Sequence, residues 1–339
     1  MKNKIIAGLL IGLLVCMLVL SGCGKKGTGN KTISIKLTTV QLDTQQMGVA
    51  AQQLKKLVDE RLGSKVKLSV YTGAQLYSGV EELEALKKGD IQMCLAIGSA
   101  MGSLDPSMSI FKLPFLFPNV EVAYEILDGP TGEKVFANIK NQGIDVLGGF
   151  SSGSIIVSNS SHPLLQPADF NKLKLRTSGK MEAAIIESLG AISTVIPSEE
   201  TYTGLQQKVI DGLATPSTVF YARKYHEVQK YVTNAGMLYW SNGFILSNDK
   251  FWNELPEDIR TELESIVAEV LQDVRAKDEA ELQSMLEKLV AGGIQVHTLT
   301  PREIEAWRRA ALPVYKKYEK DIGADLIAEV TAEIEKLNK

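Results

Sequence analysis

The chain has 339 residues, of which 45% are hydrophobic and 23% are charged. This balance is typical of a globular protein of roughly two domains and excludes a largely disordered chain. The 37 basic and 40 acidic residues give a formal charge of −3, so no excess of positive charge is present to neutralise a nucleic-acid backbone. Three cysteines are too few for a disulfide framework or a four-thiolate zinc site. No histidine has another His or Cys at metal-ligand spacing, and we expect neither metal nor cofactor.

The N-terminal segment has the pattern of a lipoprotein signal peptide. A short basic start precedes an uncharged apolar run over residues 5–20, which is shorter than a membrane span of about 20 residues. The run ends in Leu20-Ser21-Gly22-Cys23, which resembles the bacterial lipobox, in which the cysteine is acylated and becomes the new N-terminus. We therefore expect residues 1–22 to be removed, Cys23 to carry a lipid, and residues 23–31 to form a flexible tether. The alternative is an uncleaved signal anchor.

The predicted cleavage places the mature protein outside the cytoplasm. Of the 339 residues, removal of 22 leaves 317, with 35 basic and 40 acidic side chains. We expect a monomer that is held by its lipid at the outer face of the cell membrane or in the periplasm. Cys94, the one cysteine left unmodified, stands between Met93 and Leu95 and is expected in the core.

After the tether, strands and helices alternate along the chain. Apolar residues at alternate positions predict strands, and apolar residues at helical spacing predict helices. The expected strands are 33–40, 66–70 and 91–97, and the expected helices are 45–62 and 80–88. This order indicates an α/β fold with a largely parallel sheet. Such sheets bind ligands beyond the carboxyl ends of their strands.

A change of composition indicates a second domain. A strand over residues 144–147 leads into a stretch rich in Ser, Gly and Asn over residues 151–161, which we interpret as the crossing between domains. Beyond it the expected strands are 173–176, 194–196 and 212–214, the expected helices are 181–189 and 200–209, and a strand over 244–246 returns to the first sheet.

One long helix is predicted near the C-terminus. Apolar residues recur at helical spacing from Ile259 to Leu289, with Pro256 before them and Gly292-Gly293 after them. A helix of about 35 residues is roughly 50 Å long, which is more than the width of one small domain. We therefore expect this helix to pack on both domains.

Residues 149–153 read Gly-Phe-Ser-Ser-Gly and match the nucleophile elbow of serine hydrolases. That elbow requires a helix directly after the serine. Here Ile155-Ile156-Val157 follows, which favours a strand and a loop between domains. An exported hydrolase using Ser151 is therefore kept only as an alternative, and we expect no catalytic residue.

Arg176 stands at the end of the strand predicted over 173–176. At that position its planar guanidinium can meet a ligand carboxylate with two parallel hydrogen bonds. A salt bridge to one of the acidic side chains explains the residue equally well. From the residues alone, both interpretations remain open.

Several segments taken together resemble one family of binding proteins. They follow one another in family order from residue 71 to residue 231: YTGAQL at 71–76, LPFLF at 113–117, LDGPTG at 127–132, DFNKLKLR at 169–176, LGA at 189–191, ETYTGLQ at 200–206, VIDG at 209–212 and YHEVQKY at 225–231. The set is similar to the solute receptors of TRAP (tripartite ATP-independent periplasmic) transporters, the dicarboxylate-receptor (DctP-like) family. A ligand-sensing subunit for a membrane kinase is the other alternative.

The resemblance implies a two-lobed periplasmic-binding-protein-like fold of the class II type, with a hinge and a long helix spanning both lobes. Lobe I would comprise residues 32–150 plus about 241–275, and lobe II residues 151–240 plus about 276–339. The lobes would close on a small organic acid, which the receptor delivers to a TRAP permease. Arg176, which matches the family's arginine at the end of the KLKLR strand, would clamp the ligand carboxylate.

The sequence also departs from the family's pattern. Thr215 stands where an asparagine commonly donates to the ligand, Ser154 where many members carry an arginine, and Ser198 where an aromatic residue often packs over the ligand. Tyr239 and Trp240 are candidate walls of the site. Fewer charged donors imply a ligand with one carboxylate and a less polar remainder. We also expect contacts from the opposite lobe, by Gln75 and Ser99.

Overall fold

The computed structural model of the protein describes residues 32–337. The chain divides into two units by contacts between residues, Met1–Ile33 and Ser34–Lys339. The described sheets and helices belong to the second unit, except that the first strand begins at Ile33. The predicted signal peptide, Cys23 and the tether lie outside the described residues. Within residues 32–337, no helix is long and apolar enough to cross a membrane.

The first sheet has five strands in the order β2-β1-β3-β10-β4. Strand β1 runs parallel to β3, whereas β10 runs antiparallel to both β3 and β4. Alternation of apolar residues in β1 buries Ile35 and Leu37, and Cys94 in β3 is fully buried, as expected. The strands are β1 Ile33–Thr38, β2 Val66–Tyr71, β3 Met93–Ile97, β4 Ile144–Ser151 and β10 Asn242–Asn248.

The second sheet has six strands in the order β11-β9-β5-β8-β6-β7. Its parallel part contains β6 between β7 and β8, while β5 runs antiparallel to β8 and β9. The strands are β5 Ile155–Asn159, β6 Lys174–Thr177, β7 Ile192–Val195, β8 Gly212–Pro216, β9 Tyr231–Gly236 and β11 Gln295–Thr298. The sequence predicts a largely parallel sheet, whereas both sheets are mixed, because β10 and β5 each run antiparallel to both of their neighbours.

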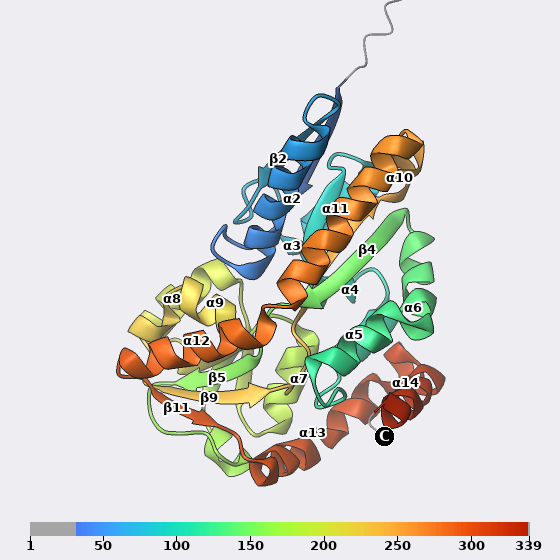
Figure 1. Cartoon of the computed structure of the whole chain (residues 1–339). Coiled ribbons are helices and arrows are strands. Elements are labelled where there is room, and N and C mark those ends of the chain that lie inside the picture. Colours follow the sequence, from blue (N-terminus) through green and yellow to red (C-terminus); the bar gives the residue numbers. More distant parts are fainter. Residues whose placement is uncertain (1–31, 338–339) are drawn as a thin grey trace, which may run out of the picture. The chain divides into compact units, whose positions relative to one another are not determined.

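Helices connect the strands and cover the sheets (Figure 1). In α2, Leu54, Leu57 and Val58 lie on one buried face, which packs on β2 and on α11. The helices that precede α11 are α2 Gln46–Leu62, α3 Gly79–Lys88, α4 Gly98–Met101, α5 Val120–Asp128, α6 Pro130–Lys140, α7 Lys180–Ser188, α8 Ser198–Gln206, α9 Ser217–Ala222 and α10 Asp249–Glu254. Three 3₁₀ helices add η1 Pro106–Lys112, η2 Pro167–Phe170 and η3 Tyr225–Glu227.

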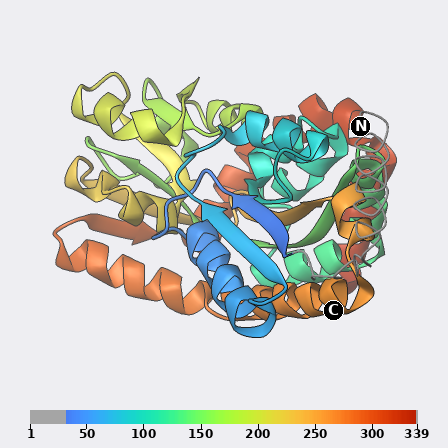
Figure 2. The same cartoon turned by 90° about the horizontal axis from the view of Figure 1, so that it is seen from above.

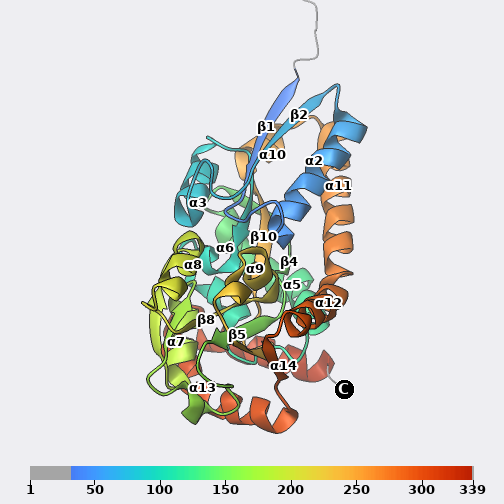
Figure 3. The same cartoon turned by 90° about the vertical axis from the view of Figure 1, so that its left-hand side faces the viewer.

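The long helix expected after Pro256 is divided in two. Helix α11 Glu257–Arg275 packs on α2 and β4, and helix α12 Asp278–Ala291 packs on α9 and β11. Figures 2 and 3 show the two helices in succession. Ala276 and Lys277 keep right-handed helical backbone angles at the break. The stretch therefore contacts both sheets, as predicted, but as two helices and not as one.

Strand β4 is longer than the sequence predicts and contains the serine of the GFSSG motif. It continues through Ser151, and β5 begins at Ile155. The Ser151 hydroxyl accepts a hydrogen bond from the backbone N–H of Gly153 at 3.1 Å. Since a strand and not a helix follows the serine, the elbow of a hydrolase is not formed.

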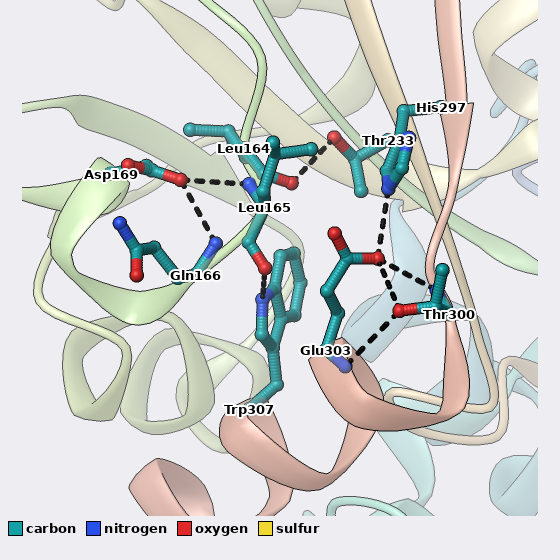
Figure 4. Close-up of polar contacts among 9 residues, drawn as sticks. All are labelled: Leu164, Leu165, Gln166, Asp169, Thr233, His297, Thr300, Glu303 and Trp307. Carbon is teal, nitrogen blue, oxygen red and sulfur yellow. Dashed lines mark hydrogen bonds and ion pairs between the residues drawn. The ribbon is translucent and has the colours of Figure 1, made fainter.

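The two C-terminal helices pack against helices of both halves of the molecule. Helix α13 Pro301–Ile322 packs on α7, η1 and η2, and helix α14 Ala324–Leu337 packs on α5. Figure 4 shows how α13 is joined to the second sheet: the indole N–H of Trp307 donates to the backbone oxygen of Leu165 at 3.0 Å, and Glu303 contacts His297 of β11 at 2.9 Å.

Candidate functional site

A cavity of about 370 Å³ lies where the carboxyl ends of strands from both sheets come together. Its wall includes the residues that follow β1 and β3 of the first sheet and those at the ends of β6, β7 and β8 of the second. The sequence predicts binding at strand ends of this kind, and the cavity lies there. The wall residues that carry the argument below are Ser99, Lys112, Ser152, Arg176, Ser198, Thr215, Arg223 and Tyr239.

Arg176 is the most deeply buried arginine of the cavity wall, with 3% of its surface exposed. Strand β6 holds it between Thr194 of β7 and Leu213 of β8. Its Nε donates to the backbone oxygen of Ile196 at 2.8 Å and its Nη2 to the Ser198 hydroxyl at 3.2 Å. Both acceptors are neutral. Ser198 therefore holds the guanidinium in place.

The charge of Arg176 has no carboxylate partner in the described part of the chain. None of the ion pairs among residues 32–337 includes it. Burial lowers the pKa of Arg176, and the nearby Tyr225, Tyr239 and Glu182 partly offset this effect. The guanidinium nevertheless remains protonated, as arginines do in proteins. A buried cation without an anion is costly, so the cavity is suited to an anionic ligand.

A second arginine reaches the same cavity. Arg223 follows α9 and lines the wall half-buried, and its buried Nε has no hydrogen-bond partner among residues 32–337. It is close enough to Arg176 to lower the pKa of that guanidinium. The cavity thus offers two cations that no carboxylate of the described chain neutralises.

Lys112 is the third cation of the wall, and it is paired. Its Nζ lies 2.9 Å from Oε1 of Glu182 and 5.2 Å from the centre of the Tyr239 ring. Burial of Tyr239, and the charge of Glu182, raise the pKa of the phenol. The Tyr239 hydroxyl therefore stays neutral and able to donate to a ligand.

Three neutral hydroxyls complete the polar part of the wall. Those of Thr215, Ser152 and Tyr239 are buried and have no partner among residues 32–337. Unpartnered buried hydroxyls cost about 1–3 kcal/mol each, and a ligand with several oxygens would satisfy them. Ser99 adds a half-buried side chain from α4, directly after β3.

The structure brings five of the eight predicted ligand residues to the cavity wall: Arg176, Thr215, Ser198, Tyr239 and Ser99. The other three are not among the residues of the wall. Trp240 is buried against Phe111, Phe117 and Tyr124, Ser154 accepts a backbone hydrogen bond from Ser217, and Gln75 is exposed. Contact of any of the eight with a ligand stays a prediction.

The sequence did not indicate Lys112, Arg223 or Ser152 as residues of the site. Lys112 had a usable signal, because a lysine within the apolar residues Ile110 to Leu113 indicates a buried charge that needs a partner. Arg223 lies in no predicted element, and only the fold carries it to the cavity. Ser152, and not the predicted Ser154, lines the cavity. Strand β4 ends at Ser151, so Ser152 is the first residue after the strand.

Comparison with known proteins identifies the family. A sequence profile of the bacterial extracellular solute-binding proteins, family 7, matches residues 38–321, a range that contains the whole cavity wall. The chain belongs to this family. Family 7 proteins are solute-binding transport proteins, and the TRAP receptor assignment made from the ordered motifs is confirmed.

Curated relatives of family 7 cover almost the entire chain. The C4-dicarboxylate-binding periplasmic protein DctP of Rhodobacter capsulatus is 33% identical over 340 residues, covering 98% of this chain and 99% of the relative. The protein of the same name from Vibrio cholerae is 34% identical over 304 residues, covering 88% and 90%.

Solved structures of TRAP periplasmic solute-binding proteins share the two-lobed fold. The protein from Sulfurospirillum deleyianum, with bound succinate, has a TM-score of 0.81 at 31% identity and covers 88% of this chain and 98% of its own. The protein from Pseudomonas aeruginosa, with bound L-malate, has a TM-score of 0.78 at 30% identity and covers 84% and 100%. The predicted α/β fold of periplasmic binding proteins is thereby confirmed.

Proposed function

We propose that this receptor binds a small organic acid in the cavity between its two sheets, with one carboxylate on Arg176. The observation that carries the proposal is the burial of that guanidinium with only neutral partners. A carboxylate would neutralise the charge and could accept two parallel hydrogen bonds from it. The named relatives support the proposal, because they bind C4-dicarboxylates, succinate or L-malate.

The number of carboxylates is also part of the proposal. From the sequence, one carboxylate is expected, because an arginine of the family pattern is absent at Ser154. Arg223 reaches the wall from a different element and has an unpartnered Nε, which supports a second acidic group on the ligand. Thr215, Tyr239 and Ser152 would then bind its remaining oxygens.

We propose further that ligand binding closes two lobes, each built on one sheet, with lobe I at residues 32–150 and about 241–275 and lobe II at 151–240 and about 276–339. The crossings near Ser151 and Ser241 and the break between α11 and α12 would bend. The closed form would deliver the acid to a TRAP permease, without chemical change of the ligand. The relatives' names favour neither the hydrolase nor the kinase-sensing alternative.

Membrane attachment through Cys23 belongs to the same proposal and rests on the lipobox-like sequence at residues 20–23. Lipid anchoring would keep a monomeric receptor near its permease at the outer face of the membrane. Incorporation of a labelled fatty acid that is lost in Cys23→Ser supports it, whereas equal labelling of both proteins contradicts it.

A thermal-shift screen of organic acids tests the ligand class. A ligand at 100 times its dissociation constant adds about 2.7 kcal/mol to the free energy of unfolding. We expect succinate, L-malate and related acids to raise the melting temperature, and their diamides and neutral sugars to leave it unchanged. Stabilisation by neutral sugars alone would contradict the proposal.

A further inference from the structure

The buried ion pair between Lys112 and Glu182 lies at the cavity wall, beside the cations that face the ligand. The side chain of Glu182 is 1% exposed and that of Lys112 is 7% exposed. Lys112 comes from the end of η1 and Glu182 from the first turn of α7. Two segments 70 residues apart in the sequence thus place a complete charge pair next to Arg176.

Glu182 is held as an anion at this position. Burial by itself would raise its pKa, but the charge of Lys112, its hydrogen bond and the charge of Arg176 lower the pKa below its ordinary value. The absence of a side chain at Gly179 makes room for the carboxylate, because a Cβ there would lie 2.7 Å from Oε2 of Glu182. The carboxylate is thus within electrostatic reach of both Lys112 and Arg176.

The charges of the wall can be counted. Lys112, Arg176 and Arg223 are cationic, and Glu199 is an exposed anion of the rim that water screens. Glu182 is the buried anion that faces this group. With Glu182 charged, two cations remain for the ligand to neutralise, and without it three would remain.

We infer that Glu182 sets the charge of the ligand that the cavity selects. It neutralises Lys112, so that two uncompensated positive charges remain, which match the two negative charges of a dianion. The inference rests on the proposed function and extends it to a residue that need not touch the ligand. Glu182 would act on the ligand indirectly, through the charge of its partner Lys112.

Electrostatics gives the sign and the size of the expected effect. Removal of the negative charge of Glu182, behind the wall, stabilises a bound dianion about twice as much as a bound monoanion, because the interaction scales with ligand charge. At an effective dielectric constant of about 20 and a separation of roughly 10 Å, the difference corresponds to a change of about tenfold in relative affinity.

The test compares two ligands of nearly the same shape and different charge, succinate and its monoamide succinamate, by titration calorimetry at low salt and pH 7. The quantity of interest is the ratio of the Kd of succinamate to the Kd of succinate. We expect Glu182→Gln to raise this ratio about tenfold. In the double variant Lys112→Met, Glu182→Gln, which removes both charges, we expect the ratio to return to within about twofold of the wild-type value.

Glu305→Gln is the control, because the lowered pKa of Glu305 keeps it ionised at pH 7 and it lies outside the cavity wall. Removal of this distant negative charge should leave the ratio unchanged. An unchanged ratio in Glu182→Gln, or equal changes in Glu182→Gln and in the double variant, contradicts the inference. Failure of the wild-type protein to bind either acid contradicts the proposed function instead. Circular dichroism of each variant shows whether the fold is retained.

Discussion

At the scale of single residues, Glu82 shows how burial alone sets a charge state. It lies in the first turns of α3 with 1% of its surface exposed, and burial raises its pKa to about 8, against a smaller effect of the Thr38 hydroxyl. Because the folded-state pKa lies above the unfolded value of about 4.5, the folded protein binds this proton more tightly. The resulting stabilisation is complete below about pH 4.5 and is lost as the pH rises through about 8.

We therefore expect Glu82→Gln, which keeps a neutral side chain at every pH, to gain stability relative to wild type as the pH rises. The free energy of unfolding of the variant minus that of wild type should increase by about 3 kcal/mol between pH 4.5 and pH 8. Urea unfolding at the two pH values measures this difference.

The neighbouring Glu81 provides the control for that measurement. Its side chain is exposed and its pKa is lowered by hydrogen bonds from Ser78. The stabilisation given by a lowered pKa is present above about pH 4.5, so Glu81→Gln should leave the difference nearly unchanged between pH 4.5 and pH 8. A pH-independent difference for Glu82→Gln would show that its carboxyl is ionised in the folded protein.

Single residues also show what the sequence could predict about the site. Arg176 was placed correctly at a strand end, because alternation in β6 gives its position. Its lack of a carboxylate partner could not be predicted, since this depends on every acidic residue that the fold brings near. Trp240 was expected beside the ligand together with Tyr239, yet adjacent side chains point in different directions, and Trp240 packs into the aromatic cluster.

At the scale of elements, the spacing of apolar residues located most strands and helices, and local backbone geometry determined where they end. The helix predicted over residues 200–209 ends at Gln206, where the positive φ of 59° at Lys208 is incompatible with further helical turns. The break between α11 and α12 was missed, because Ala276 and Lys277 are ordinary helix formers. There, packing on two different sheets overrides propensity.

The start of α13 carries an element-scale prediction. Glu303 accepts hydrogen bonds from the backbone N–H of Thr300 at 2.7 Å and from its hydroxyl at 2.9 Å, and it contacts His297 at 2.9 Å (Figure 4). These contacts lower the pKa of Glu303 to about 2. A depressed pKa stabilises the fold above about pH 4.5, and this contribution is lost as the pH falls toward 2.

We expect Glu303→Gln to lower the free energy of unfolding by about 1 kcal/mol at pH 7, after allowance for screening by water. The loss should shrink at pH 3.5. Glu305→Gln in the same helix, whose contacts to Arg308 and Arg309 are exposed, should cost less at pH 7. Equal losses for both variants would contradict a special role of the Thr300–Glu303 cap.

At the scale of the whole molecule, the site results from two sheets whose strand ends converge. The order of strands and helices along the sequence predicted two domains with sheets, and binding at the carboxyl ends of the strands. It could not predict which loops meet, because the cavity joins residues from Val40 to Ser241. Lys112 and Arg223 enter the site only through that convergence, which explains why the sequence alone suggested fewer charges at the ligand than the fold supplies.

The central claim is that Arg176 binds the carboxylate of the ligand. Titration calorimetry of wild type and Arg176→Met with succinate and L-malate tests it most directly. We expect binding to weaken at least about 30-fold in the variant, because the partner of a buried charge is removed, while the variant stays folded, since it loses a buried unpaired charge. Undiminished affinity of the folded Arg176→Met protein for either acid would contradict the account.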